Sequence, residues 1–521
     1  MNANPAVLKR DISKLQLLFI SFAAIFGSGW LFAPLYAAQI AGPASLLAWV
    51  LGALMAAVIG ITMAEVVVLF PKTGGLIHVA KLTHGSGLSA LITVLNLVVF
   101  IILPAIEVQA VLQYMSSYFG WIVDSDHRTS ILGYVLGFSF LTLITLVNLY
   151  GALFTAFITK IVVAFKIITP ALICFTFLYV VCSSGSFDPT RLTNSPLTSI
   201  PWTQVFQAIA VSGIIFSFNG FNQATLFAGE AKNPQKAIPF AILGSLLASA
   251  ILYFLIQFSL LMTVPKESFA NGWNQLSFSG DQGPFAGLAA LLGLGWLLTI
   301  IYADAVISPL GTAFAYASAA PRLFYSLAEQ EALQGAVTLK SFLKLNRHGV
   351  SYLSIVVTLA FECLAFILLP NLKAMIALLV ASFVLCYTTA PASLLSLRRT
   401  DPNLERPFKV YFAPLVCYLS LLFSNLMVFS CGWVSLRNLS VVTAGLVVIH
   451  FVLDKKNGIP GSKKVRYKFG GSIWFLFQLC SLVALAYYDH LRPLPFATAL
   501  PAVAVISFIA LILSQRISLS R

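Results

Sequence analysis

The sequence predicts an all-α integral membrane protein of about fourteen transmembrane helices, the first ten arranged as two inverted repeats of five. Three observations lead to this prediction. The 521 residues are 59% hydrophobic and only 9% charged, whereas a soluble domain carries about 25% charged residues. Long apolar segments follow one another along the chain, each close to the roughly 20 residues that cross a bilayer. Two of these segments, five apart in order, are interrupted near the middle by small and polar residues.

The apolar segments set the predicted organisation of the chain. We expect spans at residues 15–39, 43–70, 87–118, 130–151, 157–183, 203–229, 238–263, 285–318, 350–370, 373–397, 411–433, 438–453, 470–488 and 494–515. The chain then divides into a cytoplasmic N-terminus (1–14), a first repeat (15–183), a second repeat (203–397) and four additional helices (411–515).

Lys and Arg are distributed unevenly among the loops between these spans. With the N-terminus in the cytoplasm, the inner loops and termini hold 24 of the 31 basic residues and the outer loops hold 6. Cytoplasmic loops of membrane proteins carry such an excess, so we expect both termini in the cytoplasm. The same distribution explains the net charge of +14 without nucleic acid as a partner. The seven Cys have no metal-ligand spacing and read as small apolar fillers.

The first span is interrupted by glycine at its midpoint. Residues 25–34 read "IFGSGWLFAP", with Gly27, Ser28 and Gly29 at the centre. Glycine is a poor helix former, and unwound backbone is tolerated inside a bilayer only where protein, water or a ligand satisfies its polar groups. A break that binds a ligand explains the motif. Close packing of small residues between helices is the alternative.

The sixth span has a similar interruption in "VSGIIFSFNGFNQATLFAGE". Its polar and small residues are Ser217, Asn219, Gly220, Asn222 and Gln223. Because the second interruption lies five spans after the first, the two helices run in opposite directions. Inverted repeats with a discontinuous first helix in each half are a transporter architecture, and the substrate binds at the breaks near the bilayer midplane.

Several stretches resemble a known family. "IFGSGWLFAP", "AEVVVLFPKTGG" (64–75) and "FSFNGFNQATLFAGEAKNPQKAIPFA" (216–241) resemble the amino acid–polyamine–organocation transporters, over roughly residues 12 to 410. The chain is most similar to bacterial permeases of the aspartate:proton symporter type, through "IEVQAVLQY" (106–114), "FKIITP" (165–170) and "LGLGWLLTIIYADAVISP" (292–309). The resemblance implies a leucine-transporter-like fold, an amino-acid substrate and a place in the bacterial cytoplasmic membrane.

The resemblance also implies a substrate site at the two breaks. The substrate carboxylate would meet Ser28 and Gly29, with Gly27 allowing the break, and its amino group would meet main-chain carbonyls. The remaining residues of this expected site are Ile25, Phe216, Asn219, Gly220 and Asn222. Phe216 is a candidate gate, or an ordinary aromatic that faces lipid or the core. Some relatives have an acidic residue where this chain has Asn222, which puts a basic substrate in doubt.

Charged residues inside spans are costly and commonly handle ions or substrate. Lys166 resembles the fifth-helix lysine that stands at the sodium position in proton-coupled relatives, and a buried lysine can exchange a proton near neutral pH. Asp304 and Ser308 lie one turn apart on the eighth span, and Glu107 lies on the third. We expect these four residues to serve proton coupling, with snorkelling or structural hydrogen bonding as the alternatives. Glu362 on the ninth span lies outside the motifs.

Two carboxylates near the inner ends of their spans, Glu65 and Glu230, are expected to pair with inner-loop lysines or to cap helices.

The leading functional hypothesis is an importer that moves an amino acid together with a proton. An exchanger of amino acids or amines is the second hypothesis, and a nutrient sensor is the third. No nucleotide loop, zinc motif or nucleophile elbow is present, so we expect neither an enzyme nor a cofactor. Amino acid, protons and lipid are the expected partners, with a homodimer possible. The substrate side chain stays open among acidic, small neutral and aromatic.

Overall fold

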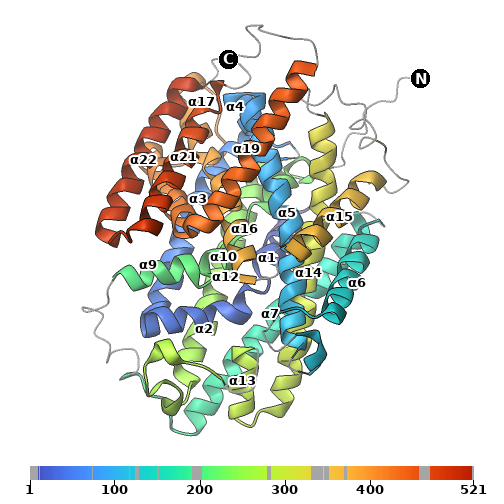
Figure 1. Cartoon of the computed structure of the whole chain (residues 1–521), viewed down its shortest axis with the longest axis vertical. Coiled ribbons are helices and arrows are strands. Elements are labelled where there is room, and N and C mark those ends of the chain that lie inside the picture. The colour runs from blue at the N-terminus through green and yellow to red at the C-terminus, as the bar shows by residue number, and fades with distance from the viewer. Residues whose placement is uncertain are drawn as a thin grey trace.

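The computed structural model describes residues 10, 12–72, 74–116, 118–123, 128–149, 152–190, 202–278, 283–329, 344, 351–368, 372–456 and 470–518. These residues are almost entirely helical (Figure 1). Two isolated bridges, Ile12 with Ala231 and Val123 with Thr129, are the β-pairing found within the described ranges. The all-α prediction is therefore confirmed.

The helices follow the predicted order of apolar segments. They are α1 Lys14–Ile25, α2 Gly29–Ala41, α3 Ser45–Leu69, α4 Leu76–His84, α5 Ser86–Met115, α6 Ile131–Asn148, α7 Ala152–Ser183, α9 Trp202–Val211, α10 Ile214–Phe218, α11 Gln223–Leu226, α12 Pro234–Thr263, α13 Pro284–Leu291, α14 Gly295–Glu329, α15 Tyr352–Leu368, α16 Leu372–Tyr387, α17 Thr389–Thr400, α18 Ala413–Ser430, α19 Gly432–Lys456, α21 Ile473–Leu491 and α22 Phe496–Ile517. Each predicted segment contains a helix or a broken helix.

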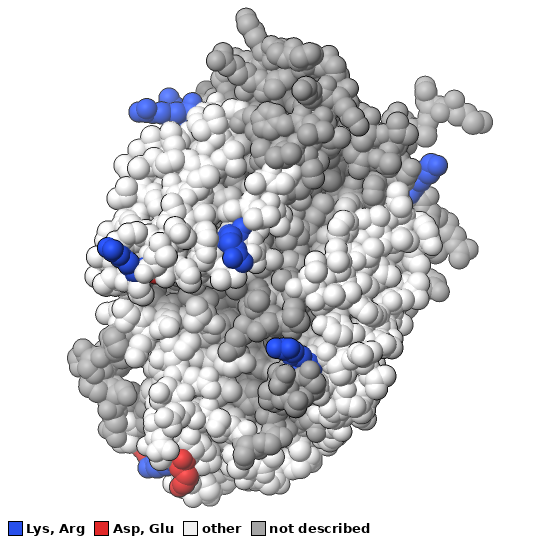
Figure 2. Space-filling model, in the orientation of Figure 1, with Lys and Arg blue, Asp and Glu red and all other residues white. Residues whose placement is uncertain are grey.

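By length and composition, nine helices in the described part of the chain could cross a membrane, or ten if the bent pair Trp202–Val211 and Ile214–Leu226 is one span. The protein is therefore a multi-pass membrane protein, while the count of fourteen stays a prediction. The surface agrees with this environment. On the face in Figure 2, charged side chains are few and most of the area is uncharged. Large apolar side chains such as Leu132 and Phe175 are exposed, as lipid-facing residues are.

Both predicted breaks are present. In the first span, α1 ends at Ile25 and α2 begins at Gly29. In the sixth span, α9 and the following α10–α11 segment are bent by 56°, and Gly213 and Gly220 have φ angles of 100° and 118°. Such angles are open to glycine at little cost. The prediction that the first and sixth helices are discontinuous is confirmed.

Two predicted segments are less regular than the sequence suggested. The segment 285–318 divides into α13 and α14 around Gly293, which has φ 70°. The segment 373–397 divides into α16 and α17 at Thr388. The short helix α4 was not predicted, because it is amphipathic and too short to span a bilayer.

At the end of the molecule that carries α4 and α17 (Figure 1), Glu65 near the end of α3 connects this helix to α17 and to the segment that follows it. Arg398 donates from Nε and Nη2 to the two carboxylate oxygens, at 3.1 and 2.8 Å. Arg406 Nε lies 3.3 Å from Oε1, and the Val410 N–H donates to Oε2 at 2.6 Å. The partners of Glu65 are therefore arginines, not the expected lysines. The Glu230 carbonyl accepts the Ile12 N–H at 3.0 Å.

The last four helices, α18, α19, α21 and α22, pack beside α3, α16 and α17 (Figure 1). At their inner end, the buried His84 of α4 bonds to the Ser514 carbonyl of α22 at 3.1 Å. Its ring lies 5.5 Å from the Trp474 ring of α21. Burial lowers the pKa of His84 to about 4, so the imidazole is neutral at physiological pH.

Candidate substrate and coupling site

The break in the first span brings a half-helix N-terminus against a buried carboxylate. The Ser28 N–H donates to Oε2 of Glu107 at 3.0 Å. Glu107 lies on α5 and is 1% exposed. Free N–H groups at a helix N-terminus attract anions. The Glu107 carboxylate therefore accepts the hydrogen bond from the Ser28 N–H, the group that was predicted to bind the substrate carboxylate.

The glycines of this break are required for close approach. A Cβ atom at Gly27 would collide with the Glu107 carboxyl group and lie 3.2 Å from the Thr312 hydroxyl. A Cβ atom at Gly29 would collide with the Ser217 hydroxyl of the sixth span. Close packing, the alternative reading of these glycines, therefore operates together with the break.

Lys166 joins three spans at the other side of the break. Its ammonium donates to the Ala23 carbonyl at 2.8 Å and to the Phe26 carbonyl and the Thr312 hydroxyl. Carbonyls at a helix C-terminus lack partners within the helix, so a buried cation is well placed there. Lys166 is 0% exposed, and it does not snorkel to the surface. Its neighbour Lys160, nearer the start of α7, is exposed.

Thr312 is a site residue that sequence reasoning missed. We expected Ser308 near the cation position, but the contact from α14 to Lys166 comes one turn later. The Ser308 hydroxyl is buried and has no hydrogen-bond partner among the described residues. The available signal was the four-residue spacing, which puts Thr312 on the same face of the helix as Ser308.

Asp304 completes a buried group of ionisable side chains. It lies about two turns before Thr312 on α14 and is 1% exposed. It interacts electrostatically with Lys166 and faces the Thr169 hydroxyl of α7, yet its oxygens have no hydrogen bond within the described ranges. Lys166 also interacts electrostatically with Glu107. The structure thus brings together Lys166, Asp304 and Glu107, although no ion pair within 4 Å joins them among the described residues.

The two breaks also touch each other. A Cβ atom at Gly220 would lie 2.6 Å from the Ala24 carbonyl carbon. The Tyr253 hydroxyl of α12 lies 3.1 Å from the Ile25 carbonyl and 2.9 Å from the Ser217 carbonyl, and it can donate to either. The Asn219 N–H donates to the Phe216 carbonyl at 3.1 Å. Two of the carbonyls predicted for the substrate amino group therefore have protein partners here.

Tyr253 was missed because nothing in its apolar surroundings distinguishes it from a core tyrosine. Its ring stacks on Phe26 and Trp49, with centroids 5.0 and 4.8 Å away. The stacking fixes the hydroxyl between the two breaks.

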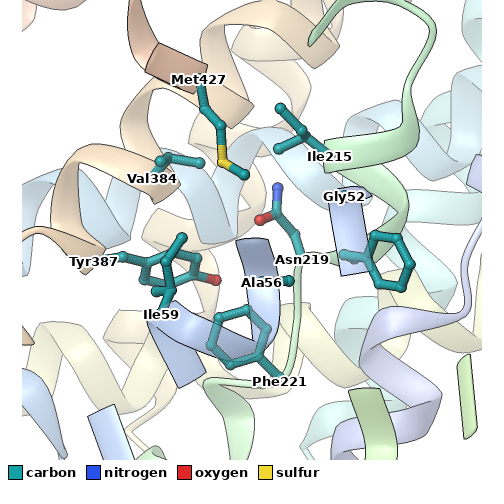
Figure 3. A pocket seen from close by; sticks show the side chains of 10 residues that line it. Gly52, Ala56, Ile59, Ile215, Asn219, Phe221, Val384, Tyr387 and Met427 are labelled. Atoms are coloured by element: carbon teal, nitrogen blue, oxygen red, sulfur yellow. The ribbon is translucent and has the colours of Figure 1, made fainter. Parts of the chain in front are cut away.

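The Asn219 side chain points into a small cavity (Figure 3). The cavity lies between α3, α10, α16 and α18, and its volume of about 10 Å³ is at the lower limit for one water molecule. The Asn219 Nδ2 has no partner in the part of the chain that the structure describes. Beside it, the Tyr387 hydroxyl donates to Oδ1 of Asn222 at 3.2 Å. Phe216, the candidate gate, is 7% exposed.

A family model described as "Amino acid permease" matches residues 12–453. The chain belongs to this family. It is 30% identical over 427 residues to the aspartate-proton symporter of Bacillus subtilis, covering 82% of this chain and 80% of that protein. It is 28% identical over 488 residues to the glutamate/serine transporter AimA of Bacillus subtilis, covering 92% and 88%. The permease is therefore an amino-acid transporter and not an enzyme, and the predicted resemblance is confirmed.

Solved structures identify the same fold for this permease. An Eremococcus coleocola manganese transporter aligns with a TM-score of 0.55 at 12% identity, covering 97% of this chain and 96% of that one. Mhp1, a nucleobase-cation-symport-1 family transporter in a closed conformation, aligns with a TM-score of 0.50 at 11% identity, covering 99% and 96%. These similarities confirm the leucine-transporter-like fold class.

Proposed function

We propose that the permease imports an amino acid together with a proton by alternating access, with the substrate bound at the breaks of the first and sixth spans. The main support for this proposal is the set of hydrogen bonds that the Lys166 ammonium donates. A buried ammonium holds two carbonyls at the end of α1 against the Thr312 hydroxyl of α14. If the lysine releases its proton, this connection weakens and α1 is free to move relative to α14.

Glu107 gives the proposal a route from substrate binding to proton uptake. A substrate carboxylate at the N-terminus of α2 would compete with Glu107 for the Ser28 N–H. A displaced Glu107 would remain buried without its hydrogen bond, and a buried unpaired carboxylate is costly. Taking up a proton removes that cost. Substrate binding and protonation of the group around Lys166 would then favour each other.

The substrate amino group would bind at the carbonyls that face the other side of the break. The Tyr253 hydroxyl now donates to the carbonyl of Ile25 or of Ser217, and it would yield to the ammonium, which is a stronger donor. Gly27, Gly29 and Gly220 permit the backbone geometry, and Phe216 would close over the bound substrate.

An acidic or small polar amino acid is the substrate class that we propose. The described donors Asn219 Nδ2 and Gln223 Nε2 are buried without partners, and each suits a carboxylate or hydroxyl oxygen. No arginine lies in a span near either break. An acidic side chain would therefore lack a bidentate arginine partner and would depend on these amide donors. The names of the relatives, an aspartate-proton symporter and a glutamate/serine transporter, support the same class. Aspartate, glutamate and serine are therefore the first substrates to test.

An exchanger is the second candidate. The chain is 24% identical over 424 residues to the serine/threonine exchanger SteT of Bacillus subtilis, covering 80% of this chain and 89% of that one. Uptake of radiolabelled amino acids into proteoliposomes separates the two candidates. Uptake that needs an inward proton gradient and no internal amino acid supports the symporter. Uptake that needs internal amino acid and ignores the gradient would contradict it.

The placement in the cell follows from the same comparisons. We propose that the permease lies in the cytoplasmic membrane of a bacterium with both termini inside, as the Bacillus relatives and the basic inner loops favour. We also propose repeats at 15–183 and 203–397, with 411–515 available for packing or for a homodimer.

A further inference from the structure

A second buried polar group lies between α6 and α15, away from the breaks. Ser354, Thr358 and Glu362 repeat every four residues on α15, so they share one face of the helix. All three are buried, at 1% exposure or less. On α6, Thr145 and Asn148 are each 5% exposed. Nothing in the proposed transport cycle uses these residues.

The packing of the two helices sets which residues face each other. The Phe366 ring would meet a Cβ atom at Gly137 at 2.6 Å, and it lies 5.5 Å from the Tyr134 ring. One turn before Phe366, the Glu362 carboxyl faces the Thr145 hydroxyl. Glu362 lies about 15 Å along α15 from Tyr352, because each helical residue rises 1.5 Å. It lies about 9 Å from Leu368 at the other end, so the carboxyl is more than two turns from the start of the helix and more than one turn from its end.

The donors around Glu362 are committed to their own helices. The Thr145 hydroxyl donates to the Leu141 carbonyl at 2.8 Å, and the Thr358 hydroxyl donates to the Ser354 carbonyl at 2.7 Å. One N–H of the Asn148 amide donates to the Ile144 carbonyl at 3.1 Å, and the second N–H makes no hydrogen bond to Glu362. Both Glu362 oxygens lack a hydrogen-bond partner in the described ranges. An ionised carboxylate only accepts hydrogen bonds, so it would find no donor here.

Among the described helices that pack most extensively against α15, no cation compensates for this lack of donors. The helices packed against α15 are α5, α14 and α6. The sequences of α5, α6 and α15 contain no Lys, Arg or His, and α14 contains only Arg322, well toward its C-terminal end. The acids Glu107 on α5 and Asp304 on α14 interact with Lys166. Cys363, the next residue on α15, interacts electrostatically with the Glu362 carboxyl and carries no positive charge. A buried carboxylate with neither a donor nor a counter-charge is too costly to persist in a membrane.

We propose that Glu362 is a proton-binding site, separate from Lys166, in which the carboxylic acid O–H donates to the Thr145 hydroxyl and fastens α15 to α6. The Thr145 hydroxyl keeps its own donation to the Leu141 carbonyl and accepts through a lone pair. A chain of two hydrogen bonds then links the two helices, and the acid O–H and the Thr145 hydroxyl each have a partner in it. The proton is held through the transport cycle and is not passed to the substrate site.

Infrared difference spectroscopy of the purified full-length permease in lipid tests this assignment. The carboxylic acid C=O stretch is distinct from the carboxylate stretches. We expect the wild type to show, at neutral pH, one carboxylic acid band that Glu362→Gln removes and that Lys166→Ala leaves in place. Retention in the Lys166 variant separates this site from the proposed coupling site. A carboxylate band lost in Glu362→Gln, with no acid band, would overturn the proposal.

Thr145→Val provides a second measurement that leaves the carboxyl in place. Valine keeps the shape of threonine but accepts no hydrogen bond, so the acid C=O band should shift while persisting. An unshifted band would contradict the Thr145 contact. Glu362→Gln keeps a donor and should preserve the Tm. A wild-type Tm that rises with Na⁺ or K⁺, and does so only with Glu362 present, would identify a cation site and overturn the proposal as well.

Discussion

Replacing Lys166 by alanine separates the coupling role of its ammonium from a structural role. The variant removes hydrogen bonds to the Ala23 and Phe26 carbonyls and to the Thr312 hydroxyl. At about 1.5 kcal/mol for each bond from a charged donor, these contacts contribute about 4–5 kcal/mol. Burying an ammonium costs several kcal/mol in the opposite direction. The two effects partly offset each other, but the Ala23 and Phe26 carbonyls left without this donor cost about 1–3 kcal/mol each, so the free energy of unfolding should fall by about 2–4 kcal/mol.

Transport should change far more than stability. Without the exchangeable proton, Lys166→Ala should lose proton-driven accumulation while still exchanging labelled for unlabelled substrate across the membrane. The assay compares gradient-driven uptake with counterflow in the same proteoliposomes, over a series of external pH values. Lys160→Ala is the matched control, because Lys160 lies on the same helix and is exposed. Accumulation by Lys166→Ala that still follows the proton gradient would refute the coupling role.

Four further predictions follow from the same contacts. Glu107→Gln should weaken the pH dependence of substrate affinity, because a neutral amide cannot exchange a proton while Lys166 still can; binding titrations at acid and neutral pH measure this. Thr312→Val should impair proton-driven uptake more than Ser308→Ala does, since the hydroxyl that meets Lys166 belongs to Thr312; equal effects in the uptake assay would contradict this. Glu65→Gln should destabilise the fold by about 3 kcal/mol, because it leaves two arginines without their buried counter-charge; the fall in Tm measures this. His84 is protonated in the unfolded chain below about pH 6.5 but in the fold only below about pH 4, so stability should decline by roughly 3 kcal/mol as the pH falls through that interval. His84→Gln should remove most of that decline in denaturation experiments.

The two breaks could be predicted from the sequence because glycine and polar residues are conspicuous inside apolar helices. Gly27 and Gly220 are poor helix formers inside apolar helical segments. This conflict between residue type and segment can be recognised in the sequence alone. Lys166 and Asp304 could be found for a similar reason, since a charge inside a span needs a purpose. Their proton-coupling role stays a prediction.

Contacts that depend on the three-dimensional arrangement could not be predicted in the same way. Tyr253 and Thr312 are common residues in membrane helices, and only packing brings their hydroxyls to the breaks. The arginine partners of Glu65 lie 333 and 341 positions along the chain, in Arg398 and Arg406. Helix α4 has neither the length nor the hydropathy of a span. In each case the deciding information is a distance between segments that are remote in sequence.

The arrangement at the breaks explains how unwound backbone can exist inside this membrane protein without substrate. Several backbone polar groups at the breaks already have a protein partner that resembles part of an amino acid. The Glu107 carboxylate takes the N–H that suits a substrate carboxylate, and the Lys166 ammonium and the Tyr253 hydroxyl take carbonyls at the end of α1. A substrate must therefore displace internal groups, two of which are ionisable. In the proposed cycle, that competition makes amino-acid binding and proton binding interdependent, since the displaced groups cannot stay charged and unpaired in a low-dielectric site.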